Sequence, residues 1–184
     1  RVFVTTAIPT AAAVPATAVQ AAEADTPDFV RREAHRPEKV LQFAVLALAR
    51  TDGRVLWQRV VAEEAPQAGT HSDGSWASGS PVTDGERVYA YFGTHGLYAL
   101  DWQGNIVWQK RLGTFKTKAN FGEGISPALC GERLVVCQDF EGPSFIVALD
   151  KRTGAEQWRT ARPEQTSWAT PLVLVQAGKP QIVV

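Results

Sequence analysis

The sequence predicts an all-β protein built from a four-stranded antiparallel unit that repeats about every 50 residues. Two markers predict this repeat. The pattern Gly-x-x-x-Trp occurs three times and ends at Trp57, Trp108 and Trp158, which lie 51 and 50 residues apart. A hydroxyl residue followed by proline recurs, with spacings of 46 and 44 residues, at 80–81, 126–127 and 170–171. Two markers that share one period indicate a repeat architecture.

The second repeat shows the strands of the unit most clearly. Residues 80–83 form a short first strand, and Asp84-Gly85 reads as a two-residue hairpin turn into a second strand at 87–92. Residues 97–101 and 106–112 supply the third and fourth strands. Four short strands joined by tight turns make an antiparallel meander.

A meander of this kind cannot cover its own apolar faces, so neighbouring units must stack, and radial stacking of four-stranded units gives a β-propeller. We predict one propeller domain that holds about three and a half blades, and we expect it to be a segment of a larger ring. Its parts are a partial first blade at 1–61 with an insertion at 9–39, a second blade at 62–112, a third at 113–162 and the start of a fourth at 163–184.

The insertion at 9–39 falls between two strands of the first blade. Its beginning is rich in alanine and threonine and is broken by Pro9 and Pro15, which predicts a mobile segment. Residues 28–36 are expected to form one or two helical turns that Pro37 ends. We interpret the insertion as a surface loop, with a partner-binding arm as the alternative.

Composition and cysteine spacing exclude several classes. Lys plus Arg equals Asp plus Glu at 19 each, so no overall field favours nucleic acid, and no apolar stretch reaches the length of a membrane span. Cys130 and Cys137 flank a predicted tight turn at Gly131-Glu132 and would lie roughly 13 Å apart along the strand rise. That separation is too long for a disulfide, and we predict two free, mostly buried thiols.

The three tryptophan patterns carry a family resemblance. The third repeat reads Ala148-x-Asp150-x-x-Thr153-Gly154-x-x-x-Trp158 and resembles the tryptophan-docking motif of PQQ-like (quinoprotein-type) β-propeller repeats. The second repeat has a turn one residue shorter, and the first replaces the acidic residue with Ala49. The resemblance implies a ring that usually closes with eight blades. The residues expected to dock one blade on the next are Ala47, Gly53, Trp57, Ala99, Asp101, Gly104, Trp108, Ala148, Asp150, Thr153, Gly154 and Trp158.

Strand direction sorts the connections between two ends of each blade. The turns between the first and second strands and between the third and fourth are tight, and they share one end. The remaining connections are irregular and collect at the other end, where we expect binding to occur because irregular loops on a rigid scaffold often carry function. The candidate residues of this binding face are His71, Asp73, Trp76, His95, Asp139 and Arg162.

Two functions follow from the resemblance. The first is a non-catalytic scaffold that binds a protein or peptide partner, or the remaining blades of its own chain, in the periplasm or cell envelope, with no cofactor. The alternative is part of a quinoprotein alcohol or sugar dehydrogenase, which would use pyrroloquinoline quinone (PQQ) and calcium. The sequence itself predicts no catalytic residue and no metal site, because no cluster of His, Asp or Glu has ligand spacing.

Overall fold

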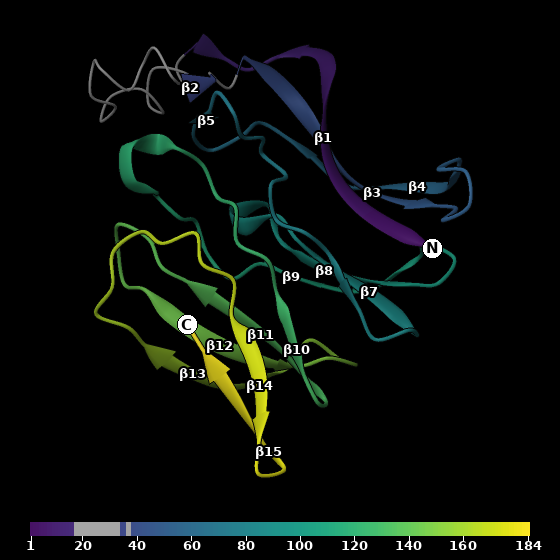
Figure 1. The fold of residues 1–184 in the computed structure, drawn as a ribbon. Coiled ribbons are helices and arrows are strands. Elements are labelled where there is room, and N and C mark those ends of the chain that lie inside the picture. Colours follow the sequence, from purple (N-terminus) through teal and green to yellow (C-terminus); the bar gives the residue numbers. More distant parts are fainter. Residues whose placement is uncertain (17–33, 36–37) are drawn as a thin grey trace.

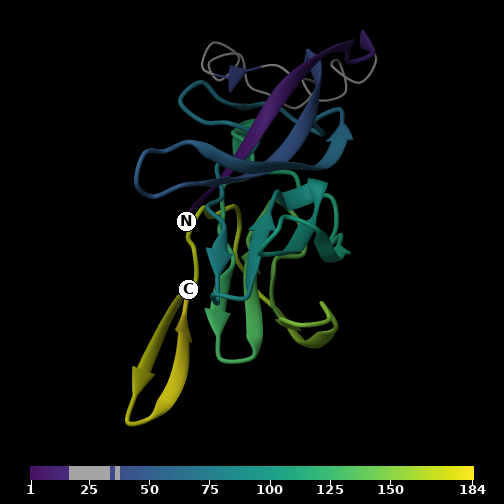
Figure 2. The ribbon, with the colours of Figure 1, turned by 90° about the vertical axis from the view of Figure 1, so that its right-hand side faces the viewer.

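Antiparallel sheets follow one another in chain order through the protein. The computed structural model describes residues 1–16, 34–35 and 38–184. In Figure 1 the sheet of the N-terminal strands lies at the top, the next two lie below it, and the last hairpin lies at the bottom. Figure 2 shows the same succession from the side.

The first two sheets are meanders of neighbouring strands. The first has the order β1-β3-β4 and the second the order β6-β7-β8-β9. The first sheet's strands are β1 (Val2–Ala13), β3 (Lys39–Leu48) and β4 (Val55–Glu64). The second sheet's strands are β6 (Val82–Thr83), β7 (Arg87–Tyr91), β8 (Leu97–Asp101) and β9 (Ile106–Lys110).

The third sheet repeats the second, and a hairpin follows it. The third sheet consists of β10 (Ala128–Cys130), β11 (Arg133–Gln138), β12 (Phe145–Asp150) and β13 (Glu156–Ala161). The hairpin pairs β14 (Leu172–Gln176) with β15 (Lys179–Val183). A separate pair joins β2 (Ala34–His35) to β5 (Thr70–His71), and 3-10 turns lie at Gly93–His95 and Lys118–Asn120. The predicted all-β class and the four-stranded antiparallel blades are confirmed.

Strand alternation places the sheets face to face. Along β7, Val88 and Ala90 pack with Phe43 and Val45 of the first sheet, whereas Tyr89 and Tyr91 join a cluster with the third sheet. A third cluster links the third sheet to the hairpin. Successive residues of a strand point to opposite faces, so each central strand contributes to two cores. The short inner strands β6, β10 and β14 also lie beside one another.

The hydroxyl–proline marker lies immediately before each of these inner strands. The Ser80 backbone N–H donates to the Ser126 hydroxyl at 2.9 Å, and the Ser126 N–H donates to the Thr170 hydroxyl at 3.2 Å. The Thr5 hydroxyl donates in the same region to the Gly79 carbonyl at 2.6 Å. The hydroxyl groups of Thr5, Ser126 and Thr170 thus link one repeat to its neighbour. This linkage explains why Ser or Thr recurs at the marker.

Each complete meander contains the same irregularity. Ala47, Ala99 and Ala148 pair directly with Trp57, Trp108 and Trp158, and the register shifts immediately after each of these alanines. All three alanines are fully buried. A shift at the same place in three sheets indicates a bulge that belongs to the repeat, since bulges re-aim side chains.

The insertion was predicted to begin too early. Strand β1 continues through Pro9 to Ala13, with Pro9 opposite Leu41 and Ala13 opposite Lys39. Proline is tolerated in β1 because an edge strand pairs on one side only, so half of its N–H groups are not needed for the ladder. The mobile start predicted for the insertion is therefore wrong for residues 9–13.

The helical turns predicted at 28–36 fall mostly outside the described residues. Where the structure describes that segment, Ala34 and His35 form strand β2 and pair with His71 and Thr70. The His35 Nε2 atom also lies 3.0 Å from the Ser72 carbonyl oxygen. The helical prediction is wrong for these two residues, because strand pairing with β5 satisfies their backbone.

The hairpin turns differ in length. Gly131-Glu132 is a two-residue turn, as predicted, since Cys130 pairs with Arg133. The Asp84-Gly85 turn is wider than predicted, because Thr83 pairs with Val88 and leaves four residues between them. The Asp84 carboxylate closes this wider turn by accepting the N–H groups of Glu86 and Arg87 at 3.0 and 2.8 Å.

Candidate functional site

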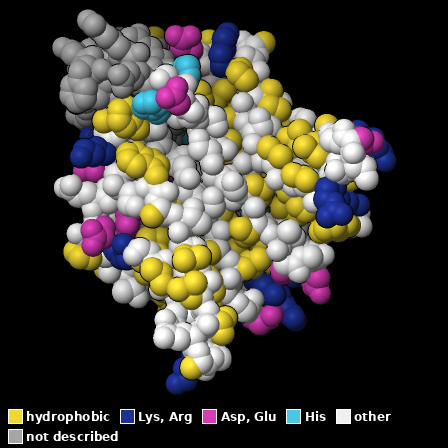
Figure 3. Space-filling model, viewed as in Figure 1, with side chains coloured by type: hydrophobic (Ala, Val, Ile, Leu, Met, Phe, Trp, Pro, Cys, Tyr) yellow, Lys and Arg dark blue, Asp and Glu magenta, His cyan; other side chains and the backbone are white. Residues whose placement is uncertain are grey.

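The irregular connections before β6, before β10 and before β14 meet and form a cavity of about 330 Å³. We call it the three-loop groove. Its lining side chains include His71, Asp73, Ser78, Phe121, Glu123 and Trp168. Two of the six predicted face residues, His71 and Asp73, therefore belong to one site. Figure 3 shows histidine side chains beside an acidic side chain on this face, with hydrophobic side chains below them.

Backbone bonds between the loops fix the groove. The His71 N–H donates to the Phe121 carbonyl at 3.1 Å, and the His71 ring packs edge-on against the Phe121 ring with centroids 4.9 Å apart. The Trp168 indole N–H donates to the Gly122 carbonyl at 2.9 Å. The loops therefore support one another as well as the strands they connect.

Glu123 is the most perturbed acid of the groove. Both carboxylate oxygens lie 3.0 Å from the Thr94 N–H, which belongs to the 3-10 turn after β7. A side chain at Gly93 would collide with this carboxylate, since a Cβ there would lie 1.9 Å from Oε2. Burial raises the pKa of Glu123 to about 7, although the Thr94 hydrogen bonds act in the opposite direction.

Trp76, in the loop before β6, and His95, in the 3-10 turn after β7, pack into the fold. The Trp76 indole N–H donates to the Ala68 carbonyl at 2.8 Å. His95 is buried, stacks on Phe43 with ring centroids 4.1 Å apart, and places Nδ1 3.0 Å from a Glu64 oxygen. Burial lowers the pKa of His95 despite this carboxylate. Neither residue lines the three-loop groove.

Glu64 also accepts Arg111, with Nη2 at 2.8 and 2.9 Å from its two oxygens. Burial alone would raise the pKa of Glu64, but the hydrogen bonds from Arg111 and His95 outweigh it and lower the pKa. This cluster joins β4 of the first sheet to the end of β9 in the second sheet.

Asp139 and Arg162 form a two-pronged ion pair. Nε and Nη2 of Arg162 donate to the two Asp139 oxygens at 2.8 and 3.1 Å. The Asp139 side chain is buried, and the Cys137 thiol lies 3.7 Å from its Oδ1 atom. Burial, followed by the Asp139 charge, raises the pKa of Cys137 to about 11. Such a thiol stays protonated and unreactive at neutral pH.

The opposite end of the sheets carries the tryptophan contacts. A Cβ at Gly104 would lie 2.9 Å from the Trp57 ring, and a Cβ at Gly154 would lie 2.8 Å from the Trp108 ring. The indole N–H of each tryptophan also bonds to the turn that contains this glycine. Trp57 donates to the Trp102 carbonyl at 3.1 Å, and Trp108 donates to the Lys151 carbonyl at 3.0 Å. The tryptophan of one repeat thus lies on the glycine of the next.

The remaining motif residues shape these turns. Asp101 Oδ1 accepts the N–H groups of Gln103 and Asn105 at 2.9 and 2.8 Å. Asp150 Oδ1 accepts the N–H and the hydroxyl of Thr153 at 2.9 and 3.0 Å, and the Thr153 N–H bond leads the causes that lower the Asp150 pKa. A Cβ at Gly53 would meet no described atom within 4 Å, and Trp158 packs in the cluster that contains Val173 and Ile182.

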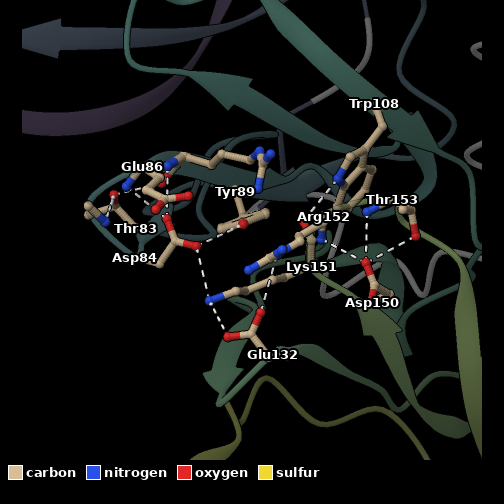
Figure 4. A network of polar contacts seen from close by, with 12 residues as sticks. Thr83, Asp84, Glu86, Tyr89, Trp108, Glu132, Asp150, Lys151, Arg152 and Thr153 are labelled. Carbon is tan, nitrogen blue, oxygen red and sulfur yellow. Dashed lines mark hydrogen bonds and ion pairs between the residues drawn. The ribbon is translucent and has the colours of Figure 1, made fainter.

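A polar network joins the second and third sheets at this end (Figure 4). Lys151 Nζ lies 3.4 Å from Asp84 and 3.1 Å from Glu132, so one ammonium group bridges turns of two sheets. The Tyr89 hydroxyl donates to Asp84 at 3.1 Å. Burial together with the Asp84 charge raises the pKa of Tyr89 to about 12.

Calcium and quinone chemistry would need carboxylates gathered at one place. Among the residues that the structure describes, no group of three or more His, Cys, Asp or Glu side chains could hold a metal ion. Cys130 and Cys137 are both free and buried, as predicted. Asp139 is occupied by Arg162.

The sequence interpretation missed Phe121, Glu123 and Trp168. A usable signal was present, because Ser78, Gly124 and Trp168 each precede a hydroxyl–proline marker by two residues. A Cβ at Gly124 would lie 3.5 Å from both the Ser78 Cβ and the Trp168 ring, so equivalent positions of three repeats meet at the groove. Aligning the repeats on this marker would have found Trp168.

Stacked four-stranded meanders with neighbouring inner strands define a β-propeller repeat protein. A family model described as outer membrane protein assembly factor BamB matches residues 42–183. The chain therefore belongs to this family of PQQ-like repeat proteins. A search of curated proteins found no match.

Solved structures with similar folds include enzymes and a BamB. Quinohemoprotein alcohol dehydrogenase from Comamonas testosteroni shares 16% identity over 66% of this chain and 19% of its own, with a TM-score of 0.46. A europium-containing methanol dehydrogenase shares 15% identity over 70% and 24%, with a TM-score of 0.48. BamB from Moraxella catarrhalis shares 19% identity over 77% and 36%, with a TM-score of 0.44. The chain thus spans well under half of each of these proteins.

Proposed function

We propose that this chain is part of a non-catalytic propeller scaffold that binds a protein or peptide partner in the bacterial envelope. The observation that carries the proposal is the three-loop groove, which presents the exposed Trp168 ring and the exposed Asp73 carboxylate on a support fixed by backbone bonds. Exposed aromatic side chains at a concave surface favour protein recognition. The family's description, an assembly factor for outer membrane proteins, supports the same function and location.

Several side chains of this face that could do acid–base or nucleophilic chemistry are held in contacts within the protein. His95 is buried against Phe43 and Glu64, Arg162 holds Asp139, and the Cys137 thiol has a raised pKa. Glu123 accepts the Thr94 N–H. This arrangement supports binding over catalysis, because a general base needs a free position against a substrate. No helix in the described ranges is long and apolar enough to cross a membrane.

Site-specific photo-crosslinking in bacterial cells that produce this protein tests the proposed function. We expect benzoylphenylalanine at Ser78, which lines the groove, to give a discrete cross-linked partner that mass spectrometry identifies as one envelope protein. The same probe at Val107, an exposed residue of β9 outside the groove, is the control. Equal cross-linking at both positions, or none at Ser78, contradicts the scaffold function.

The dehydrogenase alternative is tested on the purified full-length protein. Incubation with PQQ and calcium, followed by alcohols and aldoses in a dye-linked oxidation assay, is expected to give no turnover. Saturable oxidation of any of these substrates would contradict the scaffold function and support the dehydrogenase.

A further inference from the structure

The three-loop groove has an open floor. Gly124 lines it between two loops, and a methyl group there would be in ordinary contact with Ser78 and Trp168 at 3.5 Å. A larger side chain would therefore occupy the space between these residues. The absence of a side chain at this position keeps a cavity of about 330 Å³ between the loops.

The two aromatic residues of the groove, Trp168 and Phe121, are anchored by hydrogen bonds, and Trp168 remains partly exposed. Trp168 is anchored through its indole N–H to Gly122, yet 43% of the residue is exposed. Phe121 is anchored through its carbonyl, which accepts the His71 N–H. A ring that is already oriented loses little entropy when a ligand packs on it.

The charge of the lining is acidic. The Asp73 side chain is 93% exposed, and Glu123 also lines the groove, with its carboxylate turned toward the Thr94 N–H. The Asp73 N–H donates to His71 Nδ1 at 3.1 Å, which makes that nitrogen an acceptor. None of the described residues that line the groove is Lys or Arg; Lys116 and Lys118 of the same loop are exposed outside it. The described lining thus combines aromatic faces with the exposed Asp73 carboxylate, which lies 3.8 Å from His71 Nδ1, and contains no Lys or Arg.

We propose that the three-loop groove binds an arginine side chain of the partner, with the guanidinium plane over the Trp168 ring and its N–H groups toward Asp73. This inference rests on the proposed scaffold function and names the chemistry that the groove recognises. Charge complementarity selects a cation, and the indole selects arginine over lysine because the planar, weakly hydrated guanidinium stacks on an aromatic face.

Three blocked tripeptides test the proposal on the purified protein: acetyl-Gly-Arg-Gly-amide, its lysine analogue, and its citrulline analogue, which keeps the shape of arginine without the charge. The readout is the indole N–H signal of Trp168 in ¹⁵N spectra, assigned by its loss in Trp168→Phe. We expect saturable shifts with the arginine peptide, weaker binding of the lysine peptide, and at least fivefold weaker binding of the citrulline peptide. Equal affinity for arginine and citrulline would overturn the proposal.

Groove variants locate the site. Asp73→Asn is expected to weaken binding of the arginine peptide about threefold to tenfold. The control Asp52→Asn removes the same charge at an exposed turn of the opposite end and should leave the affinity for this peptide unchanged. Gly124→Leu is expected to abolish binding by filling the cavity. If Gly124→Leu does not fold, Trp168→Ala, measured by isothermal titration calorimetry because its indole signal is absent, is expected to show the same loss. If Asp73→Asn binds the arginine peptide as tightly as the unchanged protein does, the proposed arginine site is wrong.

The outcome separates this proposal from the scaffold function. A protein that cross-links a partner through Ser78 but ignores the arginine peptide is a scaffold that recognises other chemistry. A protein that binds the peptide but cross-links no partner has the groove without the scaffold function.

Discussion

The two ends of the sheets use the same residue types for different purposes. At the tight-turn end, Trp108 lies on Gly154 and Asp84 is held by Lys151 and Tyr89. At the loop end, Trp168 keeps 43% of its surface exposed, and Asp73 projects into solvent. Repeated turns have the same shape in each unit, so their side chains can meet regularly. Loops of unequal length leave the Trp168 ring and the Asp73 carboxylate largely exposed, and these groups remain available to a ligand.

The largest expected effect breaks the tight-turn contact. Gly154→Ala introduces a Cβ 2.8 Å from the Trp108 ring at a φ of +73°, and we expect a loss of about 2–4 kcal/mol in the free energy of unfolding measured in urea. Gly53→Ala is the matched control, since Gly53 has a φ of +74° and open space around it. It should cost only about 1 kcal/mol. Equal costs for the two variants would show that the indole contact contributes nothing.

The second effect concerns the buried acid at the loop end. The folded pKa of Glu123 is about 7, above the ordinary value of 4.5, so its protonated form favours the folded state. The contribution of Glu123 to stability is therefore greatest below pH 4.5 and declines as the pH rises through 7. We expect Glu123→Gln to stabilise the protein at pH 8 by on the order of 2–3 kcal/mol and to change little at pH 4.

Urea unfolding at pH 4, 6 and 8 measures this difference. Glu86→Gln, at an exposed turn position, is the control and should show no such dependence. A gain that is the same at every pH would mean that ionisation of Glu123 is not its cause.

A third, smaller effect concerns the inner strands, which both ends share. Ser126→Ala removes the acceptor of the Ser80 N–H, and we expect a loss of about 1 kcal/mol in the free energy of unfolding. Ser126→Thr keeps a hydroxyl, as Thr170 does in the next repeat, and should retain most of the stability. If the threonine variant loses as much as the alanine variant, the hydroxyl is not the stabilising group.

The smallest effect tests the ion pairs of the tight-turn end. Lys151→Gln is expected to lose about 0.5–1 kcal/mol at low salt and less in 1 M NaCl, because screening weakens its contacts with Asp84 and Glu132. Arg152→Gln, whose pair with Glu132 is exposed, should change almost nothing. A loss that salt does not reduce would point to packing of the lysine stem.

Much of the fold could be predicted because the repeat displays it several times. Val88 and Tyr89 of one strand face two different cores, and equivalent positions recur in the other sheets. The strands predicted in one repeat therefore support those predicted in the others. The extension of β1 to Ala13 could not be predicted, since its alanines have low strand preference and are held by pairing with β3. The four-residue turn at Asp84 depends on side-chain hydrogen bonds that composition does not reveal.

The candidate site was only partly predictable. His71 and Asp73 are close together in a polar loop and were found there, but Phe121 and Trp168 come from loops of other repeats. His95, Asp139 and Arg162 were selected as polar residues of irregular connections. Their burial in contacts with Glu64 or with each other follows from chain segments up to 31 residues away.

By itself, the sequence determined the repeating unit, the order of its strands and the glycines and tryptophans that recur in its turns, because local periodicity and turn chemistry are written along the chain. The tertiary structure decided which polar groups are buried and which stay open to solvent. That decision depends on how three loops of different length meet when the sheets stack, and no single repeat contains the information. The groove that distinguishes this protein lies at that meeting point.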